Sequence, residues 1–183
     1  MSVHFDPVTG KLSGDQVVLT ARTIADLKGV FRDEAARERT DQSIVAYHVE
    51  AFEPVPEGTM GGVGLATTYL YAGTVGDEYY FTRGHYHKDE DRPELEVTIS
   101  GEGYLVLMDR DRVTRVEEMR PGSVHPVGPG IAHRVANTGK DTLVFVSYWA
   151  SETGHDYATI RERGFSARVR QVDSKPELMQ VED

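Results

Sequence analysis

The sequence predicts one all-β domain, a sandwich or barrel of antiparallel strands with a helix near each end. Short runs rich in Val, Tyr, Thr and Phe follow one another from residue 43 to residue 173, and turns rich in Gly, Pro, Asp and Asn separate them. Few helical patterns lie between these runs, which disfavours a parallel sheet because parallel strands need long crossover connections. A chain of 183 residues is ordinary for a single domain with its own core.

Residues 1–42 are predicted to form an N-terminal arm followed by a helix, which Thr23 can cap. The helix is expected over residues 23–39, where apolar side chains recur at helical spacing. These side chains are Ile24, Leu27, Phe31 and Ala35.

Residues 43–173 are predicted to form the barrel. Its clearest strand is residues 95–100, LEVTIS, in which apolar and polar residues alternate and give one face of each kind. Other strands are expected near residues 44–52, 65–71, 78–87, 103–109, 112–118, 123–127, 133–136, 141–149 and 166–172. A short helix at about 155–163 ends at Gly164, and the polar tail, residues 174–183, is expected to be loose.

The composition narrows the possible functions. Twenty Lys and Arg against thirty Asp and Glu give a net charge of −10, which disfavours broad binding to a nucleic-acid backbone but still permits a local site for a small anion. No window approaches the ~20 apolar residues of a membrane-spanning helix, and the start MSVHFDPVTG lacks the regions of a secretory signal. We therefore expect a cytoplasmic protein without nucleic-acid or membrane partners. Because the chain has no cysteine, any metal must be held by histidine nitrogen and carboxylate oxygen.

Two histidines in the run Gly84-His85-Tyr86-His87 are spaced for chelation, because residues i and i+2 of a strand point to the same face. Glu94 follows a loop-like stretch, KDEDRP, and can face the pair from a neighbouring strand. His133 follows a turn and can come from a third strand. Together they supply three nitrogens and one oxygen and leave two adjacent positions of an octahedral ion for substrate. Fe(II), Mn(II), Ni(II), Co(II) and Zn(II) all fit this set, whereas a lone H-x-H is more often a pair of hydrogen-bonded strand residues.

The wider spacing resembles the two motifs of the cupin superfamily. His85-x-His87 is followed by Glu94 and by a glycine seven residues later, with a loop two or three residues longer than usual, and His133-x3-Asn137 matches the second motif. Cupins are small β-barrels, or jelly rolls, with a metal ion in the lumen. The resemblance therefore implies one cupin domain with one divalent ion per chain, and Fe(II) is our first expectation for that ion.

Three strings resemble a narrower family, the cupin-type glucose-6-phosphate isomerases. They are Thr82-Arg83-Gly84-His85-Tyr86-His87, Pro93-Glu94 through Gly101-Glu102-Gly103, and Gly154-His155-Asp156-Tyr157 running to Gly164-Phe165-Ser166. The likeness extends from about residue 44 to residue 172. It implies an isomerase that interconverts glucose 6-phosphate and fructose 6-phosphate, with a divalent cation polarising the oxygens at C1 and C2. A homodimer is expected by the same resemblance.

The resemblance also implies roles for single residues. The metal ligands fall on His85, His87, Glu94 and His133. The sugar-phosphate contacts fall on Thr68, the Thr82 hydroxyl, the Gly84 amide and Tyr157, with His155 and Tyr157 closing the pocket. Without the resemblance, Thr82 reads as a strand threonine, Gly84 as a glycine that allows a kink, and Tyr157 as a buried side chain that fixes the late helix.

This chain departs from the family beside the glutamate ligand. The family usually has Y-P-E-x-Y, whereas this sequence has Arg92-Pro93-Glu94-Leu95-Glu96, so the preferred sugar can differ. Glu94 is the family candidate for proton transfer, but a carboxylate bound to a cation is a weak base. Glu96 shares its strand face, and we consider that it assists or replaces Glu94; the alternative is a solvated strand glutamate. Tyr157 is the third candidate catalytic residue.

Two other functions fit the same residues. Three histidines and a glutamate with open positions can activate O₂ at Fe(II), which would make the protein a cupin dioxygenase. A noncatalytic module that binds a sugar phosphate or a metal is also consistent with an altered pocket. Fold alone does not separate these functions, because function resides in the site.

Overall fold

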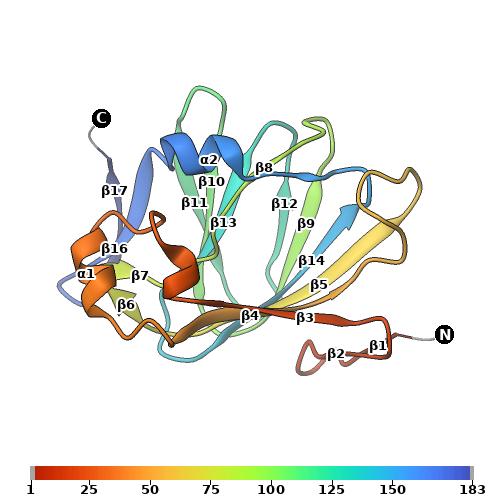
Figure 1. Ribbon diagram of the computed structural model, residues 1–183, viewed down its shortest axis with the longest axis horizontal. Coiled ribbons are helices and arrows are strands. Elements are labelled where there is room, and N and C mark those ends of the chain that lie inside the picture. Colours follow the sequence, from red (N-terminus) through yellow and green to blue (C-terminus); the bar gives the residue numbers. More distant parts are fainter. Residues whose placement is uncertain (1–2, 182–183) are drawn as a thin grey trace.

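Two antiparallel sheets face each other and form a barrel in the computed structural model, which describes residues 3–181 (Figure 1). The larger sheet has six strands, in the spatial order β12 (Val124–Val127), β9 (Glu94–Ser100), β14 (Leu143–Ala150), β5 (Val63–Leu70), β4 (Val45–Phe52) and β3 (Val18–Thr23). The smaller sheet has three strands, in the order β11 (Thr114–Met119), β10 (Gly103–Met108) and β13 (Ala132–Asn137). The neighbouring strands of both sheets are antiparallel, which confirms the predicted all-β barrel of antiparallel strands.

Shorter strands and helices complete the fold. Two of the small sheets have two strands each: β1 (His4–Phe5) pairs with β2 (Leu12–Ser13), and β15 (His155–Asp156) pairs with β8 (Tyr86–His87). A third small sheet has four strands, in the order β17 (Lys175–Gln180), β16 (Ala167–Val172), β7 (Glu78–Tyr79) and β6 (Thr74–Val75). The helices are a 3₁₀ turn, η1 (Ala25–Leu27), and two α-helices, α1 (Glu34–Arg39) and α2 (Ala158–Arg163). Within residues 3–181, no helix is long and apolar enough to cross a bilayer.

Apolar side chains fill the end of the barrel nearer the helices. Leu105 and Leu107 of β10 are fully buried, as are Ile24 and Leu27 beside η1, and Phe165 is 1% exposed. Burying an aliphatic or aromatic side chain of this size contributes about 1.5–3 kcal/mol. The packed end therefore supplies a rigid base for the open end of the barrel.

Strand β9 turns its polar face to the inside of the barrel. Glu94 and Glu96 are 7% and 3% exposed, whereas Leu95 between them is 38% exposed. The apolar outer face is covered near Ile99 by the N-terminal arm, where Gly10 packs so closely that an added Cβ would lie 3.3 Å from the Ile99 side chain. The predicted alternation is thus confirmed, and its polar side faces the lumen.

The predicted continuous helix over residues 23–39 is wrong. The chain forms η1, turns at Gly29 with a φ of +74°, and begins α1 only after Asp33, whose side chain accepts a hydrogen bond from the Ala36 amide. Between the two helices, the Val30 carbonyl accepts from Arg168, and the Arg32 amide donates to the Glu78 carboxylate. These tertiary hydrogen bonds use backbone groups that a continuous helix would need for itself.

Three further expectations differ from the structure. The late helix expected at about 155–163 begins only at Ala158, because His155 and Asp156 form β15. The predicted strand 78–87 consists of β7 and β8 with an irregular segment between them. The tail was expected to be loose, but β17 pairs with β16 over its whole length. A tight turn at Asp173 and Ser174, both with positive φ, joins the two strands, and this is the geometry that favours a two-residue hairpin. The predicted helix end at Gly164 is confirmed, since that residue caps α2.

Asn137, the last residue of the H-x3-N string, ties three segments together inside the barrel. Its amide donates to the carbonyls of Leu70 and Asp141 at 2.8 and 2.9 Å, and its side-chain oxygen accepts from the Gly139 amide at 2.9 Å. The side chain is fully buried. The asparagine of the H-x3-N string therefore stabilises the barrel by satisfying buried backbone groups.

We expect Asn137→Ala to lower the free energy of unfolding by about 2–4 kcal/mol, because it leaves several buried backbone groups without partners at roughly 1–3 kcal/mol each. Urea unfolding followed by circular dichroism measures the change. Lys140→Ala, an exposed substitution nearby, serves as the control and should change stability by less than about 0.5 kcal/mol. Equal stability of the Asn137 variant and the control would contradict this role.

Candidate metal centre

An antiparallel bridge delivers two of the candidate ligands. The His85 amide donates to the His133 carbonyl at 3.2 Å, and the His133 amide donates to the His85 carbonyl at 3.1 Å. Gly84 precedes this bridge with a φ of +78°, and an added Cβ there would lie 3.0 Å from the His133 carbonyl oxygen. Only glycine fits this position, so the local sequence Gly84-His85 is required for the bridge.

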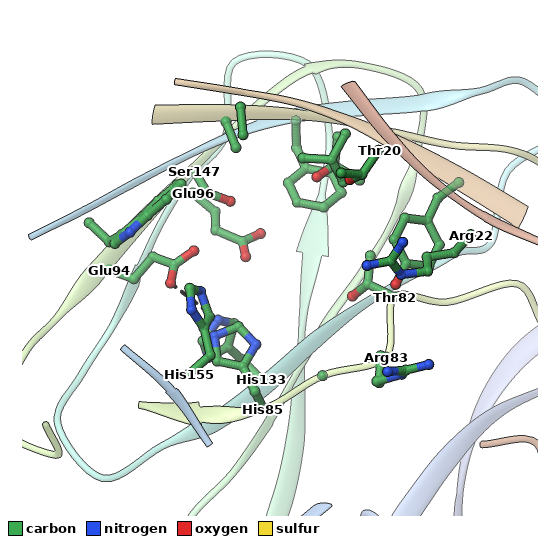
Figure 2. Close-up of a pocket in the computed structure, with 18 of the residues that line it drawn as sticks. Thr20, Arg22, Thr82, Arg83, His85, Glu94, Glu96, His133, Ser147 and His155 are labelled. Atoms are coloured by element: carbon green, nitrogen blue, oxygen red, sulfur yellow. Dashed lines mark ion pairs between the residues drawn. The ribbon is translucent and has the colours of Figure 1, made fainter. Parts of the chain in front are cut away.

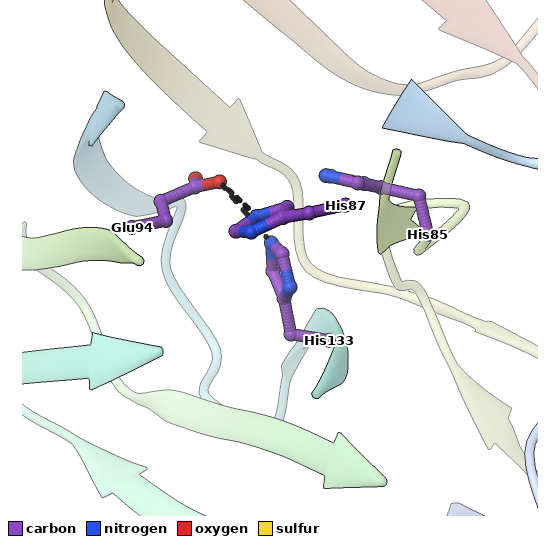
Figure 3. Close-up of side chains that lie close together, drawn as sticks. All are labelled: His85, His87, Glu94 and His133. Atoms are coloured by element: carbon purple, nitrogen blue, oxygen red, sulfur yellow. Dashed lines mark hydrogen bonds and ion pairs between the residues drawn. The ribbon is translucent and has the colours of Figure 1, made fainter. Parts of the chain in front are cut away.

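The structure brings all four predicted metal ligands together. His85, His87, Glu94 and His133 each offer one ligand atom, and these atoms lie within 4.8 Å of one another. Figure 3 shows the rings of His85 and His87, from one segment, converging with the His133 ring and the Glu94 carboxylate from two others. One oxygen of Glu94, Oε2, lies 3.1 Å from His87 Nε2 and 3.4 Å from His133 Nε2. Since metal–ligand bonds of about 2.0–2.3 Å place opposite ligands up to roughly 4.6 Å apart, small side-chain movements suffice to enclose an ion.

The hydrogen bonds of His87 fit a cation at this centre. A carbonyl oxygen can only accept, so His87 Nδ1 carries a proton and donates to the Arg92 carbonyl at 2.6 Å. In the neutral ring, Nε2 then has only a lone pair, yet it faces the Glu94 carboxylate at 3.1 Å. Two acceptors this close need a proton or a metal ion between them. Such an Nδ1 hydrogen bond to a carbonyl is the usual support of a metal-bound imidazole.

Burial and charge set the protonation of this cluster. Burial and the neighbouring His133 hold the pKa of His85 well below its ordinary value, and its Nε2 has no hydrogen-bond partner among the described residues. Burial alone would raise the pKa of Glu94, but the charge and hydrogen bonds of His133 and His87 hold it well below its ordinary value. A neutral imidazole and an ionised carboxylate are the forms that bind metal. The donor set therefore fits a divalent ion.

A pocket of about 570 Å³ opens into the barrel from His85, Glu94 and His133, three of these four residues (Figure 2). One end holds the histidines with Glu94 and Glu96. Figure 2 places Thr82, Arg22 and Arg83 at the other end of the same space. The pocket therefore has a metal-ligating, acidic end and a cationic, hydroxyl-bearing end.

The predicted substrate residues all border this pocket. They are Thr68, Thr82, Gly84, His155 and Tyr157. The Thr82 hydroxyl oxygen accepts a hydrogen bond from the Val135 amide at 3.0 Å, which leaves its proton to donate elsewhere. The His155 ring stacks on Tyr157 with centroids 5.7 Å apart, and its Nδ1 contacts the Glu57 carboxylate at 2.9 Å. Partial burial raises the pKa of Tyr157 to about 12, so its phenol stays protonated at neutral pH and can donate.

The two residues that replace the family tyrosines lie in different surroundings. Arg92 is held outside the pocket by Asp89 at 3.1 Å and by Glu152 at 3.5 Å. Glu96 lines the pocket, and its Oε2 is buried without a hydrogen-bond partner among residues 3–181. Burial and the Glu94 charge raise the pKa of Glu96 well above its ordinary value. Of the two departures, only Glu96 therefore changes the chemistry of the pocket.

Several residues that the sequence did not single out for the pocket also line it. Arg22 comes from β3 and Tyr47 from β4, and Trp149 of β14 closes one side. The alternation in residues 18–23, which points every second side chain to one face, was the available signal for Arg22. That strand was assigned to the arm, so the signal was missed.

Comparisons with known proteins agree with this geometry. The family model described as Glucose-6-phosphate isomerase (GPI) matches residues 21–181. The glucose-6-phosphate isomerase of Pyrococcus abyssi is 39% identical over 171 residues, which cover 92% of this chain and 88% of that protein. The enzyme of Thermococcus kodakarensis is 37% identical over 180 residues, which cover 98% and 93%. Among solved structures, an oxalate decarboxylase from Bacillus subtilis is 19% identical with a TM-score of 0.47, covering 60% of this chain and 26% of that chain.

Removing one imidazole should empty the metal centre. Changes in residues that only support a metal ligand cost about 10- to 100-fold in affinity, so we expect His85→Ala to weaken binding of a divalent ion by about 100-fold or more. Metal content after dialysis, measured by mass spectrometry, reports the loss. His48→Ala is the matched control, because His48 bonds to Tyr71 and does not line the pocket. A full equivalent of metal in the His85 variant would contradict the site.

The protonation of Glu96 should make the free energy of unfolding of the metal-free protein depend on pH. Because its folded pKa is raised above the ordinary 4.5, the folded state holds this proton more tightly than the unfolded state does. The contribution of Glu96 to the free energy of unfolding is therefore fully present below about pH 4.5. It is lost as the pH rises towards the pKa of Glu96 in the folded state. Glu96→Gln removes the titration and keeps the shape.

With EDTA present, we expect the melting temperature of Glu96→Gln to exceed that of the wild type by a margin that grows between pH 5 and pH 8. Differential scanning calorimetry measures both proteins, and Glu118→Gln, an exposed change on β11, provides the control. A constant or shrinking margin would show that Glu96 ionises freely in the folded protein.

Proposed function

This chain belongs to the glucose-6-phosphate isomerase family, and on that premise we propose that it interconverts glucose 6-phosphate and fructose 6-phosphate. The observation that carries the proposal is the polarity of the pocket. A sugar phosphate has its reacting oxygens at C1 and C2 and its phosphate at the other end of the chain. The pocket has metal ligands at one end and arginines with a threonine hydroxyl at the other. The metal-ligating end of the pocket therefore suits the reacting oxygens of the sugar, and the arginine-bearing end suits its phosphate.

We propose that the three histidines and Glu94 hold one divalent ion, Fe(II) by preference. When bound, such an ion supplies Lewis-acid polarisation of the sugar oxygens at C1 and C2. The protein's part is to hold the rings in the correct orientation, which the hydrogen bond from His87 to the Arg92 carbonyl supports.

The phosphate is assigned to the opposite end of the pocket. Thr82 has a hydroxyl proton to donate, because its oxygen already accepts from the Val135 amide. Gly84 lets the main chain approach closely, and Thr68 and Tyr157 add further hydroxyl groups. Arg22 and Arg83 provide positive charge near these donors, which offsets the net charge of the chain locally. His155 and Tyr157 line the pocket beside His85, where they can contact the sugar.

Glu94 and Glu96 divide the proton transfers between them in this proposal. The reaction moves a proton from C2 to C1, while O1 gains a proton and O2 loses one. Glu94 carries the carbon proton through Oε1, since its Oε2 faces the histidines. Glu96, whose pKa is raised well above its ordinary value by burial and the Glu94 charge, can give its proton to O1 and then recover one from O2. Two carboxylates with opposite protonation are what an acid and a base require.

A homodimer that works in the cytoplasm is also part of this proposal. Strand β3 is the last strand of the six-stranded sheet, and Val18 and Leu19 on it are 60% and 66% exposed. An unpaired strand edge of this kind is a frequent place for two copies to meet.

A coupled assay on metal-reconstituted protein tests the function. We expect conversion of fructose 6-phosphate to glucose 6-phosphate, loss of activity with EDTA, and its return with Fe(II). A panel of hexose and pentose phosphates then identifies the preferred sugar. We expect Glu96→Gln to lower kcat by about 100-fold, within the usual contribution of a general acid or base.

The controls separate the possible outcomes. Glu118→Gln removes a similar charge on the exposed surface and should retain full activity. Full turnover of Glu96→Gln with bound metal would remove Glu96 from the mechanism. O₂ uptake without sugar conversion would identify an oxygenase, and metal binding with neither activity would identify a binding module.

A further inference from the structure

A second cavity, of about 500 Å³, lies beside α2 and has six basic side chains in its lining. Its basic side chains come from the loop after η1, the segment before β8, strand β13, helix α2 and strand β16. They are Lys28, Arg83, Arg134, Arg161, Arg163 and Arg168. Glu162 is the one carboxylate among the described residues that line it. In a chain with a net charge of −10, this is a strong local concentration of positive charge.

Arg134 is the central observation. It is 3% exposed and lies between two aromatic rings, with its guanidinium carbon 4.3 Å from the centroids of Phe81 and of Phe165. No carboxylate of residues 3–181 forms an ion pair with it. The nearest acidic group named by its charge effects, Glu78, already pairs with Arg168 at 2.8 Å. Burial and the Arg168 charge lower the pKa of Arg134 to about 9, so it remains charged at neutral pH.

Other donors at the cavity are also incompletely used. The Nε atoms of Arg83 and Arg168 are buried and have no hydrogen-bond partner among the described residues. A buried charge without an anion costs free energy, and the two ring faces offset only part of that cost. Unused guanidinium donors around an enclosed space are what a bound anion would satisfy.

The cavity is separated from the catalytic pocket by a wall one residue thick. Gly84 faces the catalytic pocket, and a Cβ added to it would lie 2.8 Å from the Phe165 ring and 2.9 Å from Arg134 Cβ. Among residues 3–181, only Arg83 and Tyr157 border both spaces. The second cavity can therefore be filled while the metal end of the first pocket is occupied.

We propose that this second cavity binds a small phosphate-bearing anion at the arginines of β13, α2 and β16. The volume exceeds that of inorganic phosphate and falls in the range of small-molecule sites, so the occupant is an organic phosphate. This site is additional to the substrate pocket and does not depend on the proposed isomerase activity.

Calorimetric titration with inorganic phosphate at low ionic strength tests the proposal on the full metal-loaded chain. We expect two phosphate sites in the wild type. Thr82→Val should remove the site in the catalytic pocket and leave the other. The double variant Arg161→Gln/Arg163→Gln should weaken the second site at least tenfold and leave the first, because both arginines lie on the cavity's exposed side. The matched control, Arg115→Gln/Arg120→Gln, changes two exposed arginines in β11 and directly after it and should bind as the wild type does.

Each result decides the question. A phosphate site that survives Thr82→Val but is lost in the Arg161/Arg163 variant supports the cavity, even if the protein proves inactive on sugar phosphates. Wild-type affinity in that double variant, or loss of all phosphate binding in Thr82→Val alone, would overturn the proposal.

Arg134→Met separates binding from a purely structural role. Methionine can fill the space between the two rings without a buried charge, so we expect an equal or higher melting temperature together with loss of phosphate-induced stabilisation at the second site. A lower melting temperature with unchanged phosphate binding would mean that Arg134 only holds Phe81 and Phe165 together.

Discussion

The backbone bridge between His85 and His133 is the constraint on which the candidate centre depends. Each residue donates its amide to the carbonyl of the other, so one pair of hydrogen bonds fixes two imidazoles at once. The segment before β8 has little regular structure of its own, and this bridge anchors it to β13. Gly84 makes the bridge possible because no side chain fits against His133. The position of the ligands is therefore set by main-chain pairing, which leaves few side-chain rotations to be fixed by metal binding.

Two buried carboxylates on one strand have pKa values that are shifted in opposite directions, because their neighbours differ. Glu94 faces His87 and His133, whose charge and hydrogen bonds stabilise its ionised form. Glu96 faces the same lumen without such a partner, and the charge of Glu94 opposes its ionisation. The strand period of two places both side chains on one face, so their proximity follows from β9 alone. The opposite directions of their pKa shifts follow from what the other strands bring to each of them.

The sequence predicted the cluster of His85, His87, Glu94 and His133 and the all-β class, because H-x-H and turn-separated β runs are local patterns and the cupin motif spacing adds Glu94 and His133. It was insufficient where tertiary contacts decide. The helix at residues 23–39 is interrupted because Arg168 and Glu78, far along the chain, use its backbone groups. The tail pairs as β17 through a turn at Asp173 and Ser174, which lacks the usual glycine. Arg22 was missed as a pocket residue because an edge strand rich in exposed residues resembles an irregular arm.

Net charge describes this molecule poorly at the scale of its cavities. Six basic side chains and one carboxylate surround the cavity beside α2, although acidic residues outnumber basic ones in the chain. The field at a buried point is determined by nearby charges, because those at the surface are screened within about 10 Å. Gly84 connects the two sites, since its main chain borders the catalytic pocket and its missing side chain admits Phe165 and Arg134 from behind. The close packing that positions His85 thus also forms one wall of the cationic cavity, so a substitution that enlarges Gly84 would disturb both sites together.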